Sequence, residues 1–232
     1  MLKHRRWSAL SGGDLAWLKA KHHFAITPGA NPSHGPVGSL IVWNDDEIAP
    51  STGFPMHAHK DIEIITYVRN GVLAHEDSLG SIGRIEAGDV QVMSAGTGIR
   101  HSEYNPGVEP LKIYQIWILP REKGGEPRWG AKPFPKVDRA GGFVVLASGM
   151  AGDDGALPIR ANARVLGKTL SSGRSVRYDL DFSRSAYLVA AGGSVVVNGE
   201  GVGPLDGVAI VGESSVDIFA AEDAELVMVD AG

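Results

Sequence analysis

The stretch Gly53–Val68, GFPMHAHKDIEIITYV, places four ionisable side chains at every second position, directly before an apolar run. These residues are His57, His59, Asp61 and Glu63. Successive side chains of a β-strand point to opposite faces, so we expect all four to share one face. If that face is exposed, the pattern is an ordinary polar surface. If it is buried, these groups require a metal ion or one another as partners.

The rest of the chain predicts strands and turns rather than long helices. Glycine is abundant, with 31 of 232 residues, and 13 prolines are scattered along the chain. Asn-Gly pairs at 70–71 and 198–199 are typical of tight hairpins. Only Asp14–Lys21, DLAWLKAK, has a helical pattern, and we expect a short helix there. We predict an all-β protein, a sandwich or barrel, with strands at Gly38–Trp43, Glu63–Val68, Ile113–Leu119, Phe143–Leu146, Ser194–Val197, Val208–Val211 and Glu225–Val229.

The segment Pro120–Val137, PREKGGEPRWGAKPFPKV, has no apolar period and is rich in proline and glycine, which is typical of a connection. We therefore divide the chain into a first domain at residues 1–120, a linker at 121–137 and a second domain at 138–232. All eight histidines lie within the first 101 residues. A histidine-based metal site is consequently expected in the first domain alone.

Composition restricts the function classes. The chain has no cysteine, which excludes disulfides, thiolate metal ligands and a cysteine nucleophile. A net charge of −5 argues against nucleic acid as the main partner. The basic N-terminus is not followed by an apolar segment, and no run approaches the roughly 18 apolar residues that a membrane span needs. We expect a cytoplasmic protein that does not bind membranes.

A second group of candidate ligands lies in Gly88–Asn105, GDVQVMSAGTGIRHSEYN. A strand-forming run leads into a glycine-rich turn and then to His101 and Glu103, again two residues apart. Two or three imidazoles with one carboxylate and open positions suit Fe(II), Mn, Ni, Cu or Zn. The spacing alone leaves open whether that carboxylate is Glu63 or Glu103.

Two other catalytic interpretations of this stretch are excluded. The Gly96-Thr97-Gly98 turn lacks the Lys-Ser/Thr pair and the strand-to-helix setting of a phosphate-binding loop. Ser102 is adjacent to His101, but its side chain would point to the opposite face of a strand. A histidine that holds a metal could not also act as the base for Ser102, so no Ser-His-Asp triad is predicted.

Several further residues are assigned structural roles. For His75 we expect a hydrogen bond rather than metal ligation. The pair His22-His23 is expected in a solvated segment. Four aromatic residues are expected first in the core, and alternatively in the lining of a pocket for a flat ligand: Phe24, Phe54, Tyr67 and Trp117.

The two motifs together resemble a known family. H-x-H-x(3)-E, followed by G-x(2)-H-x(3)-N at Gly98, His101 and Asn105, is similar to the two metal motifs of the cupin superfamily. More narrowly, GFPMHAHKDIEIITYV, AHEDSLG and VMSAGTGIRHSEYN resemble the pirin family, in particular its bacterial quercetinase-type members. The similarity extends to Asn44-Asp45-Asp46 and to LKIYQIWILP. It implies a bicupin, with two jelly-roll β-domains, few short helices and metal in the first domain only.

The resemblance also implies a ligand set. In pirins the carboxylate ligand comes from the second motif, so the set carried over is His57, His59, His101 and Glu103. Glu63 is then expected beside these ligands, or as the alternative carboxylate ligand. The bound cofactor would be one divalent transition metal ion, with iron favoured over Mn, Ni, Cu and Zn. One departure is Ala58, at a position where the family usually has a proline. The absence of this proline would loosen the backbone of the histidine pair slightly.

The implied function is that of a dioxygenase resembling quercetin 2,3-dioxygenase. It would open the ring of a flat flavonol-type substrate with O2, and Glu103 would take the proton of the substrate hydroxyl. The alternative is a metal-dependent binding or redox-sensor protein without turnover, with a protein partner docked on the acidic second half. Residues 140–232 carry 6 Lys/Arg against 12 Asp/Glu. A third alternative, a sugar-phosphate isomerase, would require a more basic pocket than this chain suggests.

Overall fold

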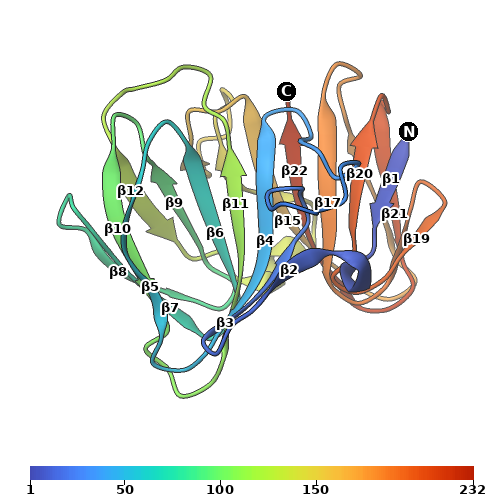
Figure 1. Cartoon of the computed structure of the whole chain (residues 1–232). Helices are drawn as coiled ribbons and strands as arrows, with labels where there is room; N and C mark the ends of the chain where they lie inside the picture. Colours follow the sequence, from blue (N-terminus) through green and yellow to red (C-terminus); the bar gives the residue numbers. More distant parts are fainter.

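The computed structural model describes residues 1–232, with the side chain of Asp138 excepted. Four β-sheets are arranged as two sandwiches that lie side by side (Figure 1). This confirms the predicted all-β class. The helical elements are two short 3-10 helices, η1 (Trp7–Ala9) and η2 (Lys136–Arg139). Within the described residues, no helix is long and apolar enough to cross a membrane.

The first sandwich contains a seven-stranded and a four-stranded sheet. The inner sheet has the order β12 (Arg128–Lys132), β9 (Val90–Ser94), β6 (Glu63–Asn70), β11 (Leu111–Ile118), β4 (Leu40–Ile48), β3 (Leu18–His22) and β2 (Ser11–Asp14). The outer sheet has the order β5 (Gly53–His59), β10 (Ile99–Tyr104), β7 (Val72–Asp77) and β8 (Ile82–Glu86).

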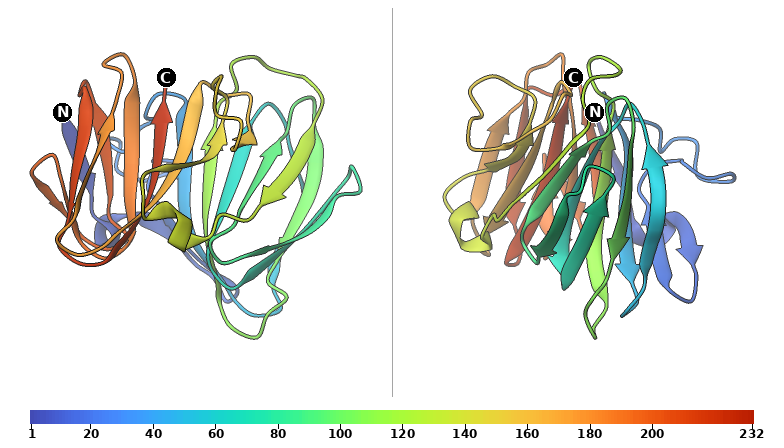
Figure 2. Two further views of the ribbon diagram at one scale, coloured as in Figure 1. Left: turned by 180° about the vertical axis from the view of Figure 1, so that it is seen from behind. Right: turned by 90° about the vertical axis from the view of Figure 1, so that its left-hand side faces the viewer.

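The second sandwich repeats this plan, and it lies beside the first in the left-hand view of Figure 2. Its inner sheet has the order β1 (Leu2–Arg5), β20 (Gly207–Val211), β17 (Ser185–Gly192), β22 (Ala224–Ala231), β15 (Ala163–Leu170), β13 (Val144–Ser148) and β14 (Leu157–Pro158). Its outer sheet has the order β16 (Ser175–Asp179), β21 (Ser215–Ala220), β18 (Val195–Val197) and β19 (Glu200–Val202).

The helix predicted at Asp14–Lys21 was wrong. β2 and β3 form a hairpin there, and β3 pairs with β4 over its whole length, from Leu18 opposite Ile48 to His22 opposite Asn44. Intrinsic helix propensity is a weak preference. The exposed edge of β4 offers a full ladder of backbone hydrogen bonds, and this tertiary pairing outweighs the local pattern.

Two segments cross the predicted division of the chain. β1 precedes the first sandwich in sequence but pairs with β20 of the second, from Leu2 opposite Ile210 to Arg5 opposite Gly207. β12 lies in the predicted linker but pairs with β9, from Arg128 opposite Ser94 onward. The domain limits at 120 and 138 remain a prediction. β1 is nevertheless a strand that the start of the chain contributes to the second sandwich.

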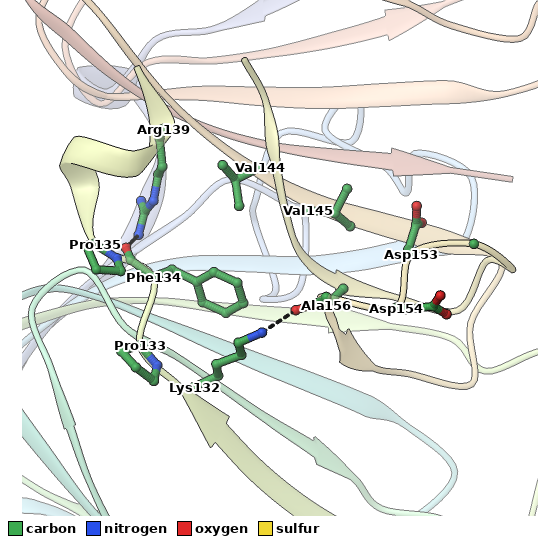
Figure 3. A pocket seen from close by; sticks show the side chains of 12 residues that line it. Lys132, Pro133, Phe134, Pro135, Arg139, Val144, Val145, Asp153, Asp154 and Ala156 are labelled. Atoms are coloured by element: carbon green, nitrogen blue, oxygen red, sulfur yellow. Dashed lines mark hydrogen bonds between the residues drawn. The ribbon is translucent and has the colours of Figure 1, made fainter. Parts of the chain in front are cut away.

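The connection between the sandwiches lines a cavity of about 470 Å³ (Figure 3). Lys132 donates to the carbonyl oxygen of Gly155 at 2.6 Å. The buried guanidinium of Arg139 donates to the carbonyl oxygens of Gly88 and Phe134. These contacts attach the connection to both sandwiches, so the two halves are held as one body.

The two inner sheets pack against each other through a single apolar cluster. It contains residues from both halves, among them Trp43, Tyr67 and Ile116 from the first sandwich and Tyr187 and Val229 from the second. The interior of the second sandwich is likewise one continuous cluster, formed by 17 buried residues. This interior therefore contrasts with that of the first sandwich.

The interior of the first sandwich is divided. Buried residues there form two separate clusters, one of Ile48, Val68, Leu73, Ile85, Leu111 and Ile113, the other of Ile62, Ile64, Met93, Ala95 and Ile99. On β6 the buried Thr66 lies between the inward residues Ile64 and Val68, and on β11 Gln115 lies between Ile113 and Trp117. A band of buried polar residues therefore crosses this core.

The position of β1 generates a stability prediction. Arg5 is 2% exposed, and its guanidinium donates to the carbonyl oxygens of His23 at 2.7 Å and Gly35 at 2.9 Å. Arg5→Ala should lower the free energy of unfolding by about 3 kcal/mol, because two buried carbonyls lose a charged donor. Lys3→Ala, at an exposed position of the same strand, should change it by less than about 0.5 kcal/mol. Equal effects in denaturant titrations would contradict this role for Arg5.

Candidate metal centre

Three neighbouring strands of the outer sheet carry the candidate ligands. His101 on β10 lies opposite His57 on β5 and opposite Asp77 on β7. Glu103, two residues further along β10, lies opposite His75. On the other side the register shifts between His101 and Glu103. Since side chains two apart share a face, the pairing gathers histidines from distant sequence positions on one inward face.

His57, His59 and His101 form one group. Each offers a ligand atom within 4.8 Å of the others. The ring centroids are 4.7 Å apart for His57 and His59, 4.4 Å for His57 and His101, and 5.0 Å for His59 and His101. His101 is buried, whereas His57 and His59 are half-buried. The group thus has one deep ligand and two ligands close to solvent.

The protonation state of these histidines suits a metal. Burial, together with the neighbouring histidines, lowers the pKa of His59 to about 4 and that of His101 to about 3. Both rings are therefore neutral at pH 7, which is the ligating form. His57 donates from Nδ1 to the carbonyl oxygen of Pro55 at 2.7 Å, which leaves its Nε2 lone pair free.

The site passes a simple test of fit for a metal ion. Both ring nitrogens of His101 are buried and lack a hydrogen-bond partner among the described residues. Buried polar atoms are normally satisfied. A metal ion bound by the three imidazoles would satisfy one of these nitrogens, so the donor set fits a transition metal.

Glu103 lies deeper, between the two sheets of the first sandwich. Gln91 Nε2 and Thr66 Oγ1 donate to its Oε1 at 2.6 and 3.2 Å, and Gln115 Nε2 donates to its Oε2 at 2.7 Å. Burial raises the pKa of Glu103 to about 7, although the three donors oppose the rise. A carboxylate has about four acceptor positions. Three are occupied, so one position on Oε2 remains for a metal.

Two tryptophans orient the glutamines that hold Glu103. Trp129 Nε1 donates to Gln91 Oε1 at 3.0 Å, and Trp117 Nε1 donates to Gln115 Oε1 at 3.2 Å. Because each glutamine oxygen accepts from an indole, each amide nitrogen faces Glu103. The same indoles contact histidines of the site: Trp117 lies edge-on to His59, 5.1 Å between ring centroids, and Trp129 stacks on His75 at 4.9 Å.

Sequence reasoning missed Thr66, Gln91, Gln115 and Trp129. The available signal was a polar residue at an inward position of an otherwise apolar strand, as in VQVM and YQIWI. Trp129 carried no such signal, because it lies in the segment predicted as a linker. The tryptophan expected in the core, Trp117, packs partly against the core and also borders the site.

The four ionisable groups of the opening stretch do not share one face. β5 ends at His59, and Asp61 adopts a φ of 53°, which interrupts the alternation before β6 begins. Asp61 instead accepts from the backbone N–H of Gly124 at 2.6 Å. The expectation of a common face was wrong, because the stretch contains a turn between strands of two different sheets.

The structure does not bring Glu63 to the three histidines. It shares a face of β6 with Ile65 and Tyr67, which pack between the sandwiches. Its carboxylate accepts from Ser94 Oγ at 2.6 Å. Glu103 does lie beside His101, but its oxygen groups with His101 and His75 rather than with His57 and His59.

Two further predictions concerned histidines. The hydrogen bond expected for His75 is present, since its Nε2 lies 3.1 Å from Asp77 Oδ2. The solvated position expected for His23 was wrong. Its ring is fully buried between the sandwiches, and Nδ1 lies 2.8 Å from the hydroxyl of Tyr187. His23 directly follows β3, and its backbone N–H donates to the carbonyl oxygen of Trp43 on β4 at 2.9 Å, so this tertiary pairing removes it from solvent.

A shallow cavity of about 370 Å³ lies beside β5 and β10. Its lining includes His59 and Ile99 and two exposed basic residues, Lys60 and Arg100; Arg100 alternates with the buried Ile99 and His101 and so faces the outer side of the sheet. Phe54 borders the group, with its ring centroid 6.2 Å from that of His57.

The chain is similar to known proteins along its whole length. The family described as Pirin matches residues 4–118, and the family described as quercetinase C-terminal cupin domain matches residues 145–231. The chain is 56% identical to the pirin-like protein of Caulobacter vibrioides over 231 residues, which cover 100% of both sequences. It is 37% identical to the quercetin 2,3-dioxygenase of Escherichia coli K12 over 231 residues, 99% of this chain and 98% of that protein.

A solved structure shows the same fold. The crystal structure of the bacterial pirin YhhW from Escherichia coli in complex with nickel(II) superposes with a TM-score of 0.93. The sequences are 35% identical, and the match covers 100% of this chain and 99% of the other. This similarity confirms the predicted arrangement of two cupin-type β-domains.

The contacts of Glu103 generate a prediction for the metal-free protein. Gln91→Leu removes a donor that stabilises the charged carboxylate, so the pKa of Glu103 should rise above its value of about 7. One lost hydrogen bond corresponds to a rise of about one pH unit. The infrared band of the protonated Glu103 carboxyl is isolated by subtracting the spectrum of the Glu103→Gln variant. In Gln91→Leu this band should persist to a higher pH than in the wild-type protein. Glu63→Gln should leave this band unchanged. If the band of Gln91→Leu instead disappeared at a lower pH than that of the wild-type protein, the role of Gln91 as a donor to the Glu103 carboxylate would be contradicted.

Proposed function

The chain belongs to the pirin family, and on that premise we propose that it is a metal-dependent dioxygenase resembling quercetin 2,3-dioxygenase. Its substrates would be a flat flavonol-type molecule and O2. The observation that carries the proposal is the buried carboxylate of Glu103 beside a cluster of three imidazoles, those of His57, His59 and His101. The quercetin 2,3-dioxygenase of Escherichia coli supports it, since the two chains align over nearly their full lengths.

The metal would be held by His57, His59 and His101, with Glu103 as the fourth ligand. Three imidazoles and a carboxylate accept iron, which we favour, and also Mn, Ni, Cu and Zn. The nickel(II) complex of the related Escherichia coli pirin supports a divalent transition metal. When bound, the ion would supply Lewis acidity that favours the ionised form of a substrate hydroxyl.

The residues of the chain would handle the proton and the substrate. Glu103 has its pKa raised to about 7, so near neutral pH it can accept the proton of a substrate hydroxyl and release it again. Phe54 and Trp117, on either side of the histidines, would offer flat apolar surface to the rings of the substrate.

A second candidate function is metal-dependent binding without turnover. Residues 140–232 carry 6 Lys/Arg against 12 Asp/Glu, and this acidic half holds no histidine. Such a half could serve as the docking face for a basic protein partner rather than as part of an enzyme. Dependence on O2 separates the two candidates, because a binding protein consumes none.

The test is O2 consumption with quercetin, in protein reloaded separately with Fe(II), Mn, Ni, Cu and Zn. We expect uptake only in the presence of both metal and flavonol. Glu103→Gln should lower the rate by about 10²–10⁴-fold, the range for loss of a general base. Glu63→Gln is the matched control and should retain the wild-type rate, since its side chain faces away from the histidines. Absence of uptake with every metal, in protein that binds metal, would favour the binding function.

A further inference from the structure

A cavity of about 720 Å³ lies where the N-terminal segment crosses through η1 from the second sandwich to the first (Figure 1). Its lining includes the face of the inner sheet that points away from the metal centre, because Asp45 and Glu47 continue the side of β4 that carries Trp43. Trp7 from η1 and Leu205 from the second sandwich also line it. We propose that this cavity binds a small aromatic molecule that carries one negative charge.

The charges that line the cavity favour an anion. The carboxylate of Glu47 is shared, since the ammonium groups of Lys19 and Lys112 each lie 3.4 Å from one of its oxygens. Asp45 accepts from Arg69 and from Trp7 Nε1. The lining contains one more basic residue than acidic ones, and this surplus matches a ligand with a single negative charge. The four basic residues are Lys19, Lys21, Arg69 and Lys112, and the three acidic residues are Asp14, Asp45 and Glu47.

Lys21 is the cation that such a ligand would meet. Its neighbour across the β3–β4 pairing, Asp45, already accepts from Arg69 and Trp7. Lys21 Nζ donates instead to the carbonyl oxygen of Leu10 at 3.3 Å, and it lies 5.1 Å from the ring centroid of Trp7. An ammonium has three N–H donors. In the part of the chain that the structure describes Lys21 uses one of them, so two remain for an anionic group.

Two apolar side chains supply the other half of the site. Trp7 is fixed, because its backbone N–H donates to Asp206 Oδ1 at 2.7 Å and its indole N–H donates to Asp45 Oδ2 at 3.1 Å. Leu205 adopts a φ of 65°, a conformation that glycine accepts far more readily than a branched residue. A leucine held in this conformation indicates a use for its side chain, which lines the cavity. A flat aromatic body fits beside these two side chains.

The experiment uses two probes on metal-free, full-length protein. Anilinonaphthalene sulfonate carries aromatic rings and one negative charge, and its fluorescence rises in an apolar site. N-phenylnaphthylamine has the same ring system without the charge and is the matched control ligand. Both are titrated into the wild-type protein and into single variants, so the contribution of the charge is separated from that of the rings.

The variants divide the site into a charged and an apolar part. Lys21→Met keeps an unbranched apolar side chain and removes the charge, so it should weaken binding of the sulfonate about tenfold and leave the neutral probe within about twofold. Glu47→Gln removes a negative charge from the cavity and should tighten binding of the sulfonate. Leu205→Gly removes apolar surface and should weaken both probes. Lys3→Met, at an exposed position of β1, is the matched control and should change neither.

The position of the bound probe is measured from backbone amide chemical shifts in nuclear magnetic resonance spectra. The signals of Gly12 and Gly13, which line the cavity, should move, and that of Ala58 at the metal centre should not. Retained binding of the neutral probe shows that Lys21→Met is folded.

Four results would refute the site. These are wild-type binding of the sulfonate in Lys21→Met, equal weakening of both probes in that variant, shifts at Ala58 in place of Gly12 and Gly13, and absence of saturable binding of the sulfonate to the wild-type protein. Neither metal nor O2 is involved, so the outcome does not depend on turnover.

Discussion

The burial of one carboxylate organises the first sandwich. Glu103 has no contact with solvent, and an ionised group in such a place is costly unless it is hydrogen-bonded. Its donors, Thr66, Gln91 and Gln115, come from three strands of the facing sheet. The same contacts that stabilise the charge therefore join the two sheets across the core. The polar band between the two apolar clusters is the consequence.

The interior of the second sandwich differs from the polar band in the core of the first. They have the same number of strands in each layer, but the second has one continuous apolar interior, and residues 140–232, which form most of it, contain no histidine. The second sandwich also supplies the surface on which the inner sheet of the first is packed. The exchange of β1 and the pairing of β12 link the halves, and β12 brings Trp129 to the site. The second sandwich thus packs against the sheet that carries Thr66, Gln91 and Gln115.

Much of the site could be predicted from sequence, because its histidines occur at strand spacing beside glycine-rich turns. His57 and His59 are two apart, as are His101 and Glu103, and a period of two is a local property of the strand. Local spacing could not decide whether Glu63 or Glu103 lies beside the histidines. It depends on which sheet face each carboxylate meets, and the turn at Asp61 reverses the expected face of Glu63. Likewise, the hairpin over 11–22 replaced a helix because β4 offered a partner.

The sequence by itself determined the all-β class, the family, the location of the histidines in one half and the absence of thiol chemistry. These properties follow from composition, spacing and motifs, which need no knowledge of partners. Tertiary structure alone decided strand pairing and register, and hence that His75 faces Glu103, that Trp129 orients Gln91, and that His23 is buried. The physical reason is that hydrogen bonds between strands join residues far apart in the chain, and the side-chain pattern of a single strand does not specify its neighbour.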